Sequence, residues 1–136
     1  FFIPLLLGTA GNTGAQSATL MLRALVTGDI EIDEWFTSFV KELGVGALLG
    51  VALGIVGWFM GFIHSGVYAG WEIGAVVGAT MVSIVVVANF VGMTLPFILA
   101  RLKLDPAVAS SPLITTIADA TGLFIYFSIA GALLDL

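Results

Sequence analysis

Long apolar stretches separated by short polar segments dominate the chain. Residues 1–22, 43–63 and 73–100 contain no charged side chain, and 106–134 contains only Asp119. Uncharged runs of about 20 residues are typical of membrane-spanning helices. The pattern therefore predicts an all-α, polytopic membrane helical bundle formed by a single transmembrane domain, 1–136, with four spans at about 1–26, 38–62, 71–100 and 106–134.

Glycines repeat at helical spacing in the second and third spans. The second span has five glycines on one helix face: Gly46, Gly50, Gly54, Gly57 and Gly61. The third span has three at the same kind of spacing: Gly70, Gly74 and Gly78. Small residues let helix backbones approach closely in lipid, where apolar burial gives no drive for association. We expect these two faces to be packing surfaces.

The start of the fourth span carries a capping signal. Asp105 immediately precedes Pro106. Aspartate is favoured at the N-cap of a helix, and proline is favoured at the first helical position. We therefore expect the fourth helix to begin at Pro106.

Composition narrows the classes of function that the chain can perform. It has four Lys and Arg residues, a formal net charge of −5 and no cysteine. So few cations cannot form a surface for phosphates, which excludes nucleic acid as a partner. Without cysteine there is no disulfide, no thiolate metal site and no sulfur nucleophile. The sequence contains no recognisable arrangement of catalytic residues, so we expect no enzyme activity. The lipid bilayer is the expected surrounding of the chain.

The four basic residues predict an orientation. Arg23 and Lys41 flank the first connection, Arg101 and Lys103 lie in the third, and the second connection, 64–71, has neither Lys nor Arg. By the positive-inside rule, the loops around 23–41 and 101–105 are cytoplasmic in a multi-pass protein of the plasma membrane. The N-terminal end of the first span then lies outside, so a cytoplasmic start requires one more helix upstream.

Asp119 is the most informative polar residue. An ionised carboxylate inside a span costs about 2.5 kcal/mol or more, and no Lys or Arg lies within the apolar runs of the spans to compensate it. Its partner must be water, a proton or a cation; the structural alternative is a protonated side chain bonded to a backbone carbonyl. Ser111 and Thr115 share its helix face at steps of four, which favours a hydrated path. The alternative for these hydroxyls is bonding to carbonyls of the preceding turn.

The segment 8–17 of the first span is unusual for a membrane helix. It contains three glycines together with Asn12 and Gln16. We expect it to loosen the helix and free backbone carbonyls, which is tolerated at membrane depth only in protein or along a water-filled cavity. The alternative is close packing through glycine, with Asn12 and Gln16 bonding across helices. Asn89, in the third span, is expected to bond between helices rather than to bind an ion.

All these candidate ligands are oxygen atoms, which favours a hard cation. One carboxylate per chain is too little to strip a divalent ion of its water. A twofold axis would supply a second Asp119 around a hydrated ion. This chemistry suggests Mg²⁺ without separating it from Ca²⁺ or Mn²⁺.

Two segments resemble a known family. Residues 4–16, PLLLGTAGNTGAQ, resemble the P-x-x-x-G-x-x-G-N-x-G-x-Q segment of the MgtE family of magnesium channels and transporters. Residues 105–112 and 115–122, DPAVASSP and TTIADATG, look like that family's last pore helix. The eukaryotic solute carrier 41 family is similar in the same segments.

The resemblance implies a homodimer with five spans per chain and a pore on the twofold axis, lined by the first and fourth spans seen here. Asp119 matches the aspartate that holds hydrated Mg²⁺. The other metal-site residues that the resemblance implies are Thr115, Ser111, Asn12, Gly8 and Gly11, together with Glu42 near the cytoplasmic mouth. The family's first helix and its cytosolic N and CBS domains have no counterpart in 1–136.

These observations lead to one functional expectation and two alternatives. We expect a pathway that conducts Mg²⁺ down its electrochemical gradient past paired Asp119 residues, with Mg²⁺ as both transported ion and pore ligand. A carrier exchanging Mg²⁺ for Na⁺ or H⁺ would use the same aspartate. A membrane scaffold that transports nothing would use the glycine faces for assembly alone.

Overall fold

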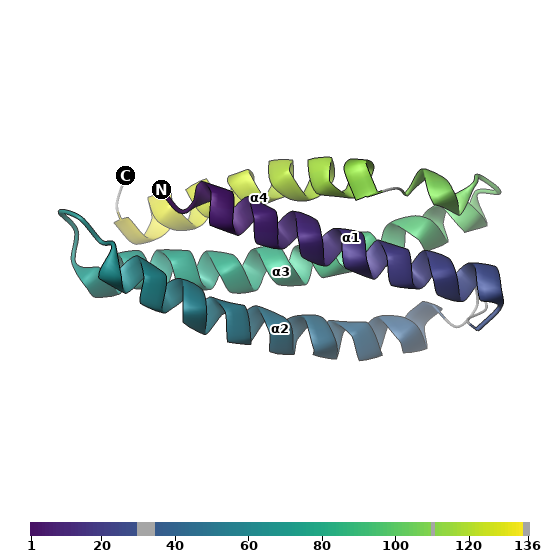
Figure 1. Cartoon of the computed structure of the whole chain (residues 1–136), viewed down its shortest axis with the longest axis horizontal. Coiled ribbons are helices and arrows are strands. Elements are labelled where there is room, and N and C mark those ends of the chain that lie inside the picture. The colour runs from purple at the N-terminus through teal and green to yellow at the C-terminus, as the bar shows by residue number, and fades with distance from the viewer. Residues whose placement is uncertain (30–34, 110, 135–136) are drawn as a thin grey trace.

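In the part of the chain that the structure describes, four long helices and one short helix form an antiparallel bundle (Figure 1). The structure is a computed structural model that describes residues 1–29, 35–109 and 111–134, without the side chains of Trp35 and Glu42. The all-α prediction is confirmed, since the described residues contain helices and no strand. The elements are α1 (Ile3–Thr27), α2 (Trp35–Ile63), α3 (Gly70–Arg101), the 3-10 helix η2 (Pro106–Val108) and α4 (Ser111–Leu134).

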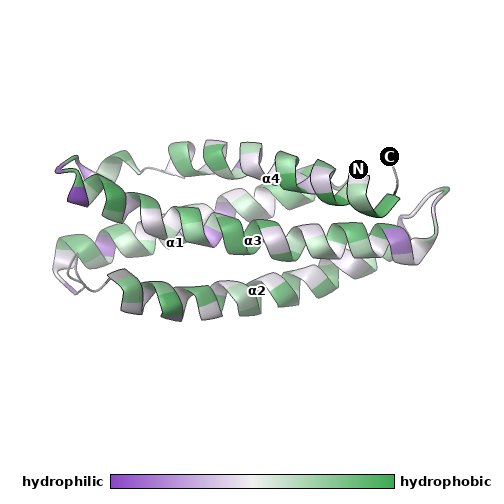
Figure 2. Ribbon diagram, turned by 180° about the vertical axis from the view of Figure 1, so that it is seen from behind, coloured by the Kyte–Doolittle hydropathy of each residue, from purple (hydrophilic) through white to green (hydrophobic). Residues whose placement is uncertain are grey.

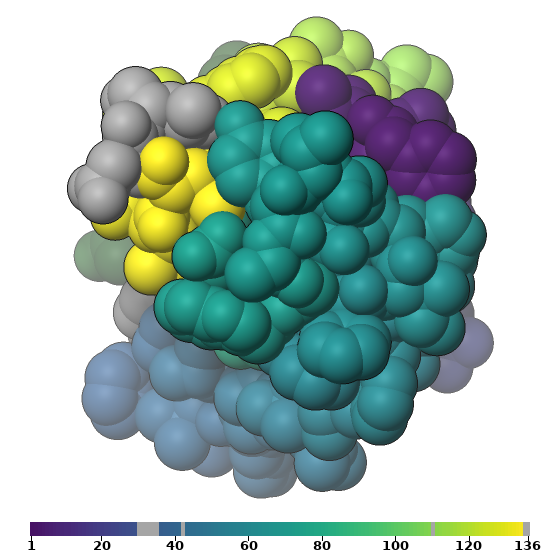
Figure 3. All heavy atoms as spheres, turned by 90° about the vertical axis from the view of Figure 1, so that its left-hand side faces the viewer, coloured from purple at the N-terminus to yellow at the C-terminus, as the bar shows by residue number. Residues whose placement is uncertain are grey.

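The two ends of the bundle differ in the connections that they carry. The start of α1, the α2–α3 turn and the end of α4 lie together, as the end-on view of Figure 3 shows in purple, teal and yellow. The rings of Phe1 and His64 stack there, with centroids 5.2 Å apart. The end of α1, the start of α2 and η2 lie at the other end (Figure 1). Both basic connections therefore share one end of the bundle, as the orientation prediction requires.

Three of the described helices are long and apolar enough to cross a membrane: Phe36–Ile63, Gly70–Arg101 and Ser111–Leu134. Figure 2 shows hydrophobic residues over most of their length. α1 is not among them, because the polar residues at its centre lower its hydropathy. Its 25 residues nevertheless extend for about 37 Å, which exceeds the bilayer core, and it lies alongside α3. The first predicted span, which corresponds to α1, stays a prediction.

The glycine faces of α2 and α3 pack against each other. A Cβ atom added to Gly54 would lie 3.2 Å from the carbonyl oxygen of Gly78, and one added to Gly61 would lie 2.7 Å from that of Ile73. From the opposite side, a Cβ on Gly74 would lie 3.0 Å from the carbonyl oxygen of Trp58. The prediction of a close α2–α3 interface through small residues is confirmed.

α3 is the central helix, since it packs against α1, α2 and α4. Val77, Met81 and Ile84 on α3 are at most 2% exposed and meet Leu6 of α1 and Ala118 of α4 in the main hydrophobic cluster. α1 and α4 also pack against each other. The arrangement gives α1 two packing partners, neither of which is its neighbour in sequence.

The expectation of an irregular backbone at 8–17 is wrong, because α1 is one continuous α-helix from Ile3 to Thr27. A glycine inside a helix costs about 1 kcal/mol relative to alanine in water. Gly11 and Gly14 offset that cost by letting α4 and α3 approach: a Cβ on Gly14 would lie 2.8 Å from Ile114 and 3.2 Å from the carbonyl oxygen of Ala88. Packing therefore preserves the helix.

The predicted start of the fourth helix is also corrected. Asp105 does act as a cap, since its Oδ1 accepts the backbone N–H of Ala107 at 2.9 Å. The helix that it caps is the short η2, which ends at Val108, and α4 begins at Ser111. Local capping signals identify a helix start but do not determine how far that helix continues.

Candidate functional site

Asp119 lies on the side of α4 that faces α1. It follows the first residue of α4 by eight positions, as Gly11 follows the first residue of α1. At 1.5 Å per residue, each lies about 12 Å from the start of its own helix. The carboxylate is half-buried, and it has no hydrogen bond or ion pair with any other residue in the described part of the chain.

The contact between α1 and α4 forms at Gly11. A Cβ atom added to Gly11 would lie 3.2 Å from Cγ2 of Thr115 and 3.8 Å from Oδ1 of Asp119. The absence of a side chain at position 11 thus allows Thr115 to approach the α1 backbone closely, with the Asp119 carboxylate beside it. Gly11, Thr115 and Asp119, three of the predicted site residues, are brought together from two helices.

The hydroxyl groups near Asp119 bond to their own helix. Thr115 Oγ1 donates to the carbonyl oxygen of Pro112 at 3.0 Å, and Thr116 Oγ1 donates to the same atom at 2.8 Å. The alternative of back-bonding is therefore the observed one for both threonines. A hydroxyl oxygen that donates its proton in this way still has lone pairs for an ion or water.

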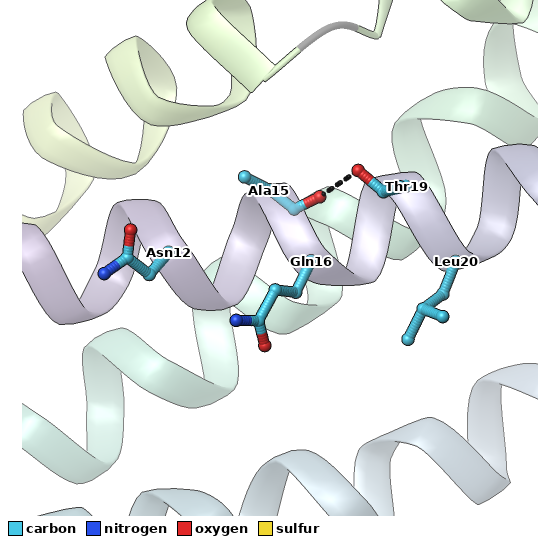
Figure 4. Close-up of a pocket in the computed structure, with 5 residues that line it drawn as sticks. All are labelled: Asn12, Ala15, Gln16, Thr19 and Leu20. Carbon is cyan, nitrogen blue, oxygen red and sulfur yellow. Dashed lines mark hydrogen bonds between the residues drawn. The ribbon is translucent and has the colours of Figure 1, made fainter.

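The outer face of α1 is polar. Asn12, Ala15, Gln16, Thr19 and Leu20 line a shallow, open depression on it (Figure 4). Asn12 and Gln16 are exposed, and neither has a hydrogen bond within the described residues, so they do not bond across helices in this chain. Thr19, which donates to the carbonyl oxygen of Ala15 at 2.8 Å, was missed as a site residue. Its spacing of three and seven residues from Gln16 and Asn12 was the available signal.

The remaining predicted residues have different surroundings. Gly8 is exposed, and nothing lies within 4 Å of a Cβ added there. Ser111 is the first residue of α4 and is exposed. The side chain of Glu42 lies outside the described residues, so its predicted position at the mouth stays untested. Gly8 and Ser111 therefore border open space in this chain rather than a packed interface.

Asn89 bonds between helices, as predicted. The hydroxyl of Ser17, on α1, donates to Oδ1 of Asn89, on α3. Both side chains are buried, at 8% and 5% exposure. The polar segment of α1 thus has two unlike sides, one hydrogen-bonded to α3 and one exposed.

The arrangement can offer oxygen ligands to a cation but cannot enclose one. Asp119 is the single carboxylate here, and the described residues contain no group of three or more metal-ligating acidic or histidine side chains. Carboxylate, hydroxyl and amide oxygens suit a hard, hydrated cation. An ion in this place would retain much of its water unless a second chain contributed.

Apolar helices of membrane-spanning length, packed through glycine beside a half-buried carboxylate without an ionic partner among the described residues, define an integral membrane protein. The comparison with known families specifies the class further. Residues 3–129 match the family MgtE, described as divalent cation transporter. The chain belongs to the MgtE family.

Curated relatives agree over nearly the whole chain. It is 48% identical over 140 residues to a magnesium transporter MgtE of Thermus thermophilus, 36% identical over 129 residues to one of Enterococcus faecalis, and 34% identical over 136 residues to one of Bacillus subtilis. These matches cover 99%, 95% and 97% of the chain but 29%, 28% and 29% of the relatives. The chain thus spans less than a third of their length. All three relatives are named as transporters, not as enzymes.

Proposed function

We propose that the chain forms the membrane pore domain of a magnesium transporter, in which two copies conduct hydrated Mg²⁺ between them past paired Asp119 residues. The observation that carries the proposal is the state of Asp119: half-buried about 12 Å inside its helix, without an ionic or hydrogen-bonding partner in the described chain, beside the α1 backbone at Gly11. The names of the three curated relatives support Mg²⁺ as the transported ion.

The polar face of α1 supports a water-filled path. Gly8, Asn12, Gln16 and Thr19 are exposed on one side of a helix that packs against the apolar α3 and α4. Polar side chains at membrane depth face a bundle interior or a water-filled cavity rather than lipid. This face of the chain therefore requires water or another protein surface in front of it.

A second copy of the chain meets this requirement. A twofold axis beside the α1–α4 contact places the same face of both copies around one path and brings two carboxylates to one level. Mg²⁺ gives up its water reluctantly and is usually held by one or two carboxylates through retained waters. Two Asp119 side chains lined by hydroxyl and amide oxygens match that preference better than one.

The basic connections orient the path in the membrane. Arg23, Lys41, Arg101 and Lys103 all belong to the end of the bundle that carries the α1–α2 connection and η2. The positive-inside rule places this end in the cytoplasm of a plasma-membrane protein. Inward flow of Mg²⁺ then proceeds from the turn between α2 and α3 towards the basic end.

Flux through the Asp119→Asn variant is the test of the proposal. Asparagine keeps the size of the side chain and removes both charges from the dimer, so we expect at least a tenfold loss of Mg²⁺ flux into proteoliposomes, with helicity and thermal stability retained. A tenfold loss of flux corresponds to a free energy of about 1.4 kcal/mol, which is less than the free-energy cost of placing an unpaired carboxylate inside the membrane. Asp105→Asn is the matched control, because asparagine also caps a helix start and the residue is exposed outside the spans.

Three outcomes contradict the proposal in different ways. Wild-type flux in Asp119→Asn removes the aspartate from the path. Protein that stays strictly monomeric by light scattering in detergent and in lipid nanodiscs removes the twofold axis. Currents that reverse with the Na⁺ or H⁺ gradient rather than at the Mg²⁺ equilibrium potential replace conduction with coupled exchange.

A further inference from the structure

Among the described residues, a buried side-chain hydrogen bond joins α1 to α3. The hydroxyl of Ser17 donates to Oδ1 of Asn89 in the buried α1–α3 interface. The Asn89 side chain also packs against α2, where a Cβ atom added to Gly46 would lie 3.1 Å from Cγ of Asn89. Asn89 therefore connects three helices, α1 through a hydrogen bond and α2 through a glycine contact.

The backbone of α1 meets that of α3 at two glycines close to this hydrogen bond. A Cβ atom added to Gly92 would lie 3.0 Å from the carbonyl carbon of Gly14 and would overlap its oxygen. Such a contact holds the helices close together but interlocks no side chains. It restrains the distance between α1 and α3 more than the rotation of α1 about its own axis. Buried α1 side chains such as Leu6 and Met21 also resist that rotation, and the Ser17–Asn89 hydrogen bond adds a directional restraint to them.

The rotation of α1 determines which residues it presents outward. With 3.6 residues per turn, Ser17 and Asn12 point about 140° apart. Ser17 accordingly bonds inward to α3, while Asn12 and Gln16 are exposed on the outer face. A modest rotation of α1 would turn these amides away and move Gly11 from its contact with Thr115 and Asp119.

We propose that Ser17 and Asn89 are positioning residues that set the rotation of α1 about its own axis. Through that rotation they direct Asn12, Gln16 and the backbone at Gly11 towards the cation path. The role of that outer face rests on the function proposed above. The rotational restraint does not, because it follows from contacts within one chain. The two can therefore fail separately.

Single-cysteine labelling tests the restraint, since the protein has no cysteine of its own. In proteoliposomes, Asn12→Cys should react faster with a membrane-impermeant thiol reagent than Thr13→Cys, one position further round the helix. Ser17→Ala should reduce this ratio roughly threefold, which corresponds to an average interhelical hydrogen bond in membranes. Ser17→Thr keeps the hydroxyl and should restore the ratio.

The matched control is Ser83→Ala on α3. It removes the same hydroxyl, but that hydroxyl donates only within its own helix, to Ala79 at 2.9 Å, so the labelling ratio should stay as in the wild type. Ser17→Ala combined with Asn89→Ala should lower the ratio no further than Asn89→Ala alone, because the two residues share one bond. An additive double variant contradicts the pairing.

A second measurement needs neither water nor transport. Spin labels at Arg23→Cys and Lys103→Cys, both exposed at the basic end of the bundle, report the α1 position as a distance distribution, which should broaden in Ser17→Ala and not in Ser83→Ala. An unchanged distribution and an unchanged labelling ratio overturn the positioning role. Absent labelling of Asn12→Cys with a broadened distribution overturns the hydrated path and leaves the positioning role supported.

Discussion

Glycine serves two different purposes in the two helix pairs of this bundle. Between α2 and α3, it brings backbones into contact along the whole interface, and Gly54, Gly61 and Gly74 each leave no room for a methyl group. On α1, Gly11 meets Thr115 of α4 closely, with the Asp119 carboxylate in van der Waals range, and Gly8 borders open space. The same residue type thus brings backbones together between α2 and α3 and leaves part of the α1 face open. The number of glycines in a helix therefore does not tell whether the helix packs closely against a neighbour or lines an ion path.

Filling the closed interface should have the largest effect. Gly61→Val introduces three carbon atoms where a Cβ would already lie 2.7 Å from the carbonyl oxygen of Ile73. Backbone cannot give way as a flexible side chain does, so we expect a loss of about 3 kcal/mol, at the upper end for overpacking. Thermal unfolding followed by circular dichroism in detergent measures it. Gly131→Val, at a position with nothing within 4 Å of a Cβ, is the control for the added side chain itself.

Removing a polar group from the open region should affect flux and spare stability. Asn12→Ala deletes an exposed amide without a hydrogen bond in the described chain, so thermal stability should change by less than about 0.6 kcal/mol, the average value of an interhelical hydrogen bond in membranes. Mg²⁺ flux per folded protein should fall severalfold. A destabilised variant with normal flux would assign Asn12 to assembly and remove one difference between the two regions.

The smallest effect is expected where the chain is most open. Gly8→Ala adds a methyl group that meets nothing within 4 Å, and alanine favours helix over glycine by up to about 1 kcal/mol in water. Stability should stay the same or rise slightly, while flux falls modestly because the path narrows. Melting and flux are measured as for Asn12→Ala. Destabilisation comparable to that of Gly61→Val would mean that Gly8 is a close contact between copies rather than part of the path.

The regular part of the fold could be predicted from the sequence because its signals are periodic. Uncharged runs located α2, α3 and most of α4, and glycines at steps of three and four identified the face that packs. Asp119 was recognisable because a lone carboxylate in an apolar run has a known cost. These features depend on one residue type at a time along one helix.

The features that could not be predicted depend on two helices at once. The glycine-rich centre of α1 remains helical because Ile114 and Ala88 pack against Gly14, and no local propensity contains that contact. Asn89 was expected to bond between helices, but its partner Ser17 is 72 positions away. The relative register of two helices is set by packing across the bundle, and a single sequence does not record it.

The central place of α3 also has a consequence for the order in which the protein is built. Synthesis from the N-terminus produces α1 before α2, α3 and α4, yet α1 packs against α3 and α4 rather than against α2. α1, the least apolar of the four long helices, is therefore made before either of its packing partners, α3 and α4, exists. The α2–α3 hairpin can close as soon as α3 emerges, and only then do Gly92 and Asn89 become available to Gly14 and Ser17. Although α1 is made before the other three long helices, it is thus among the last of the four to reach its final place.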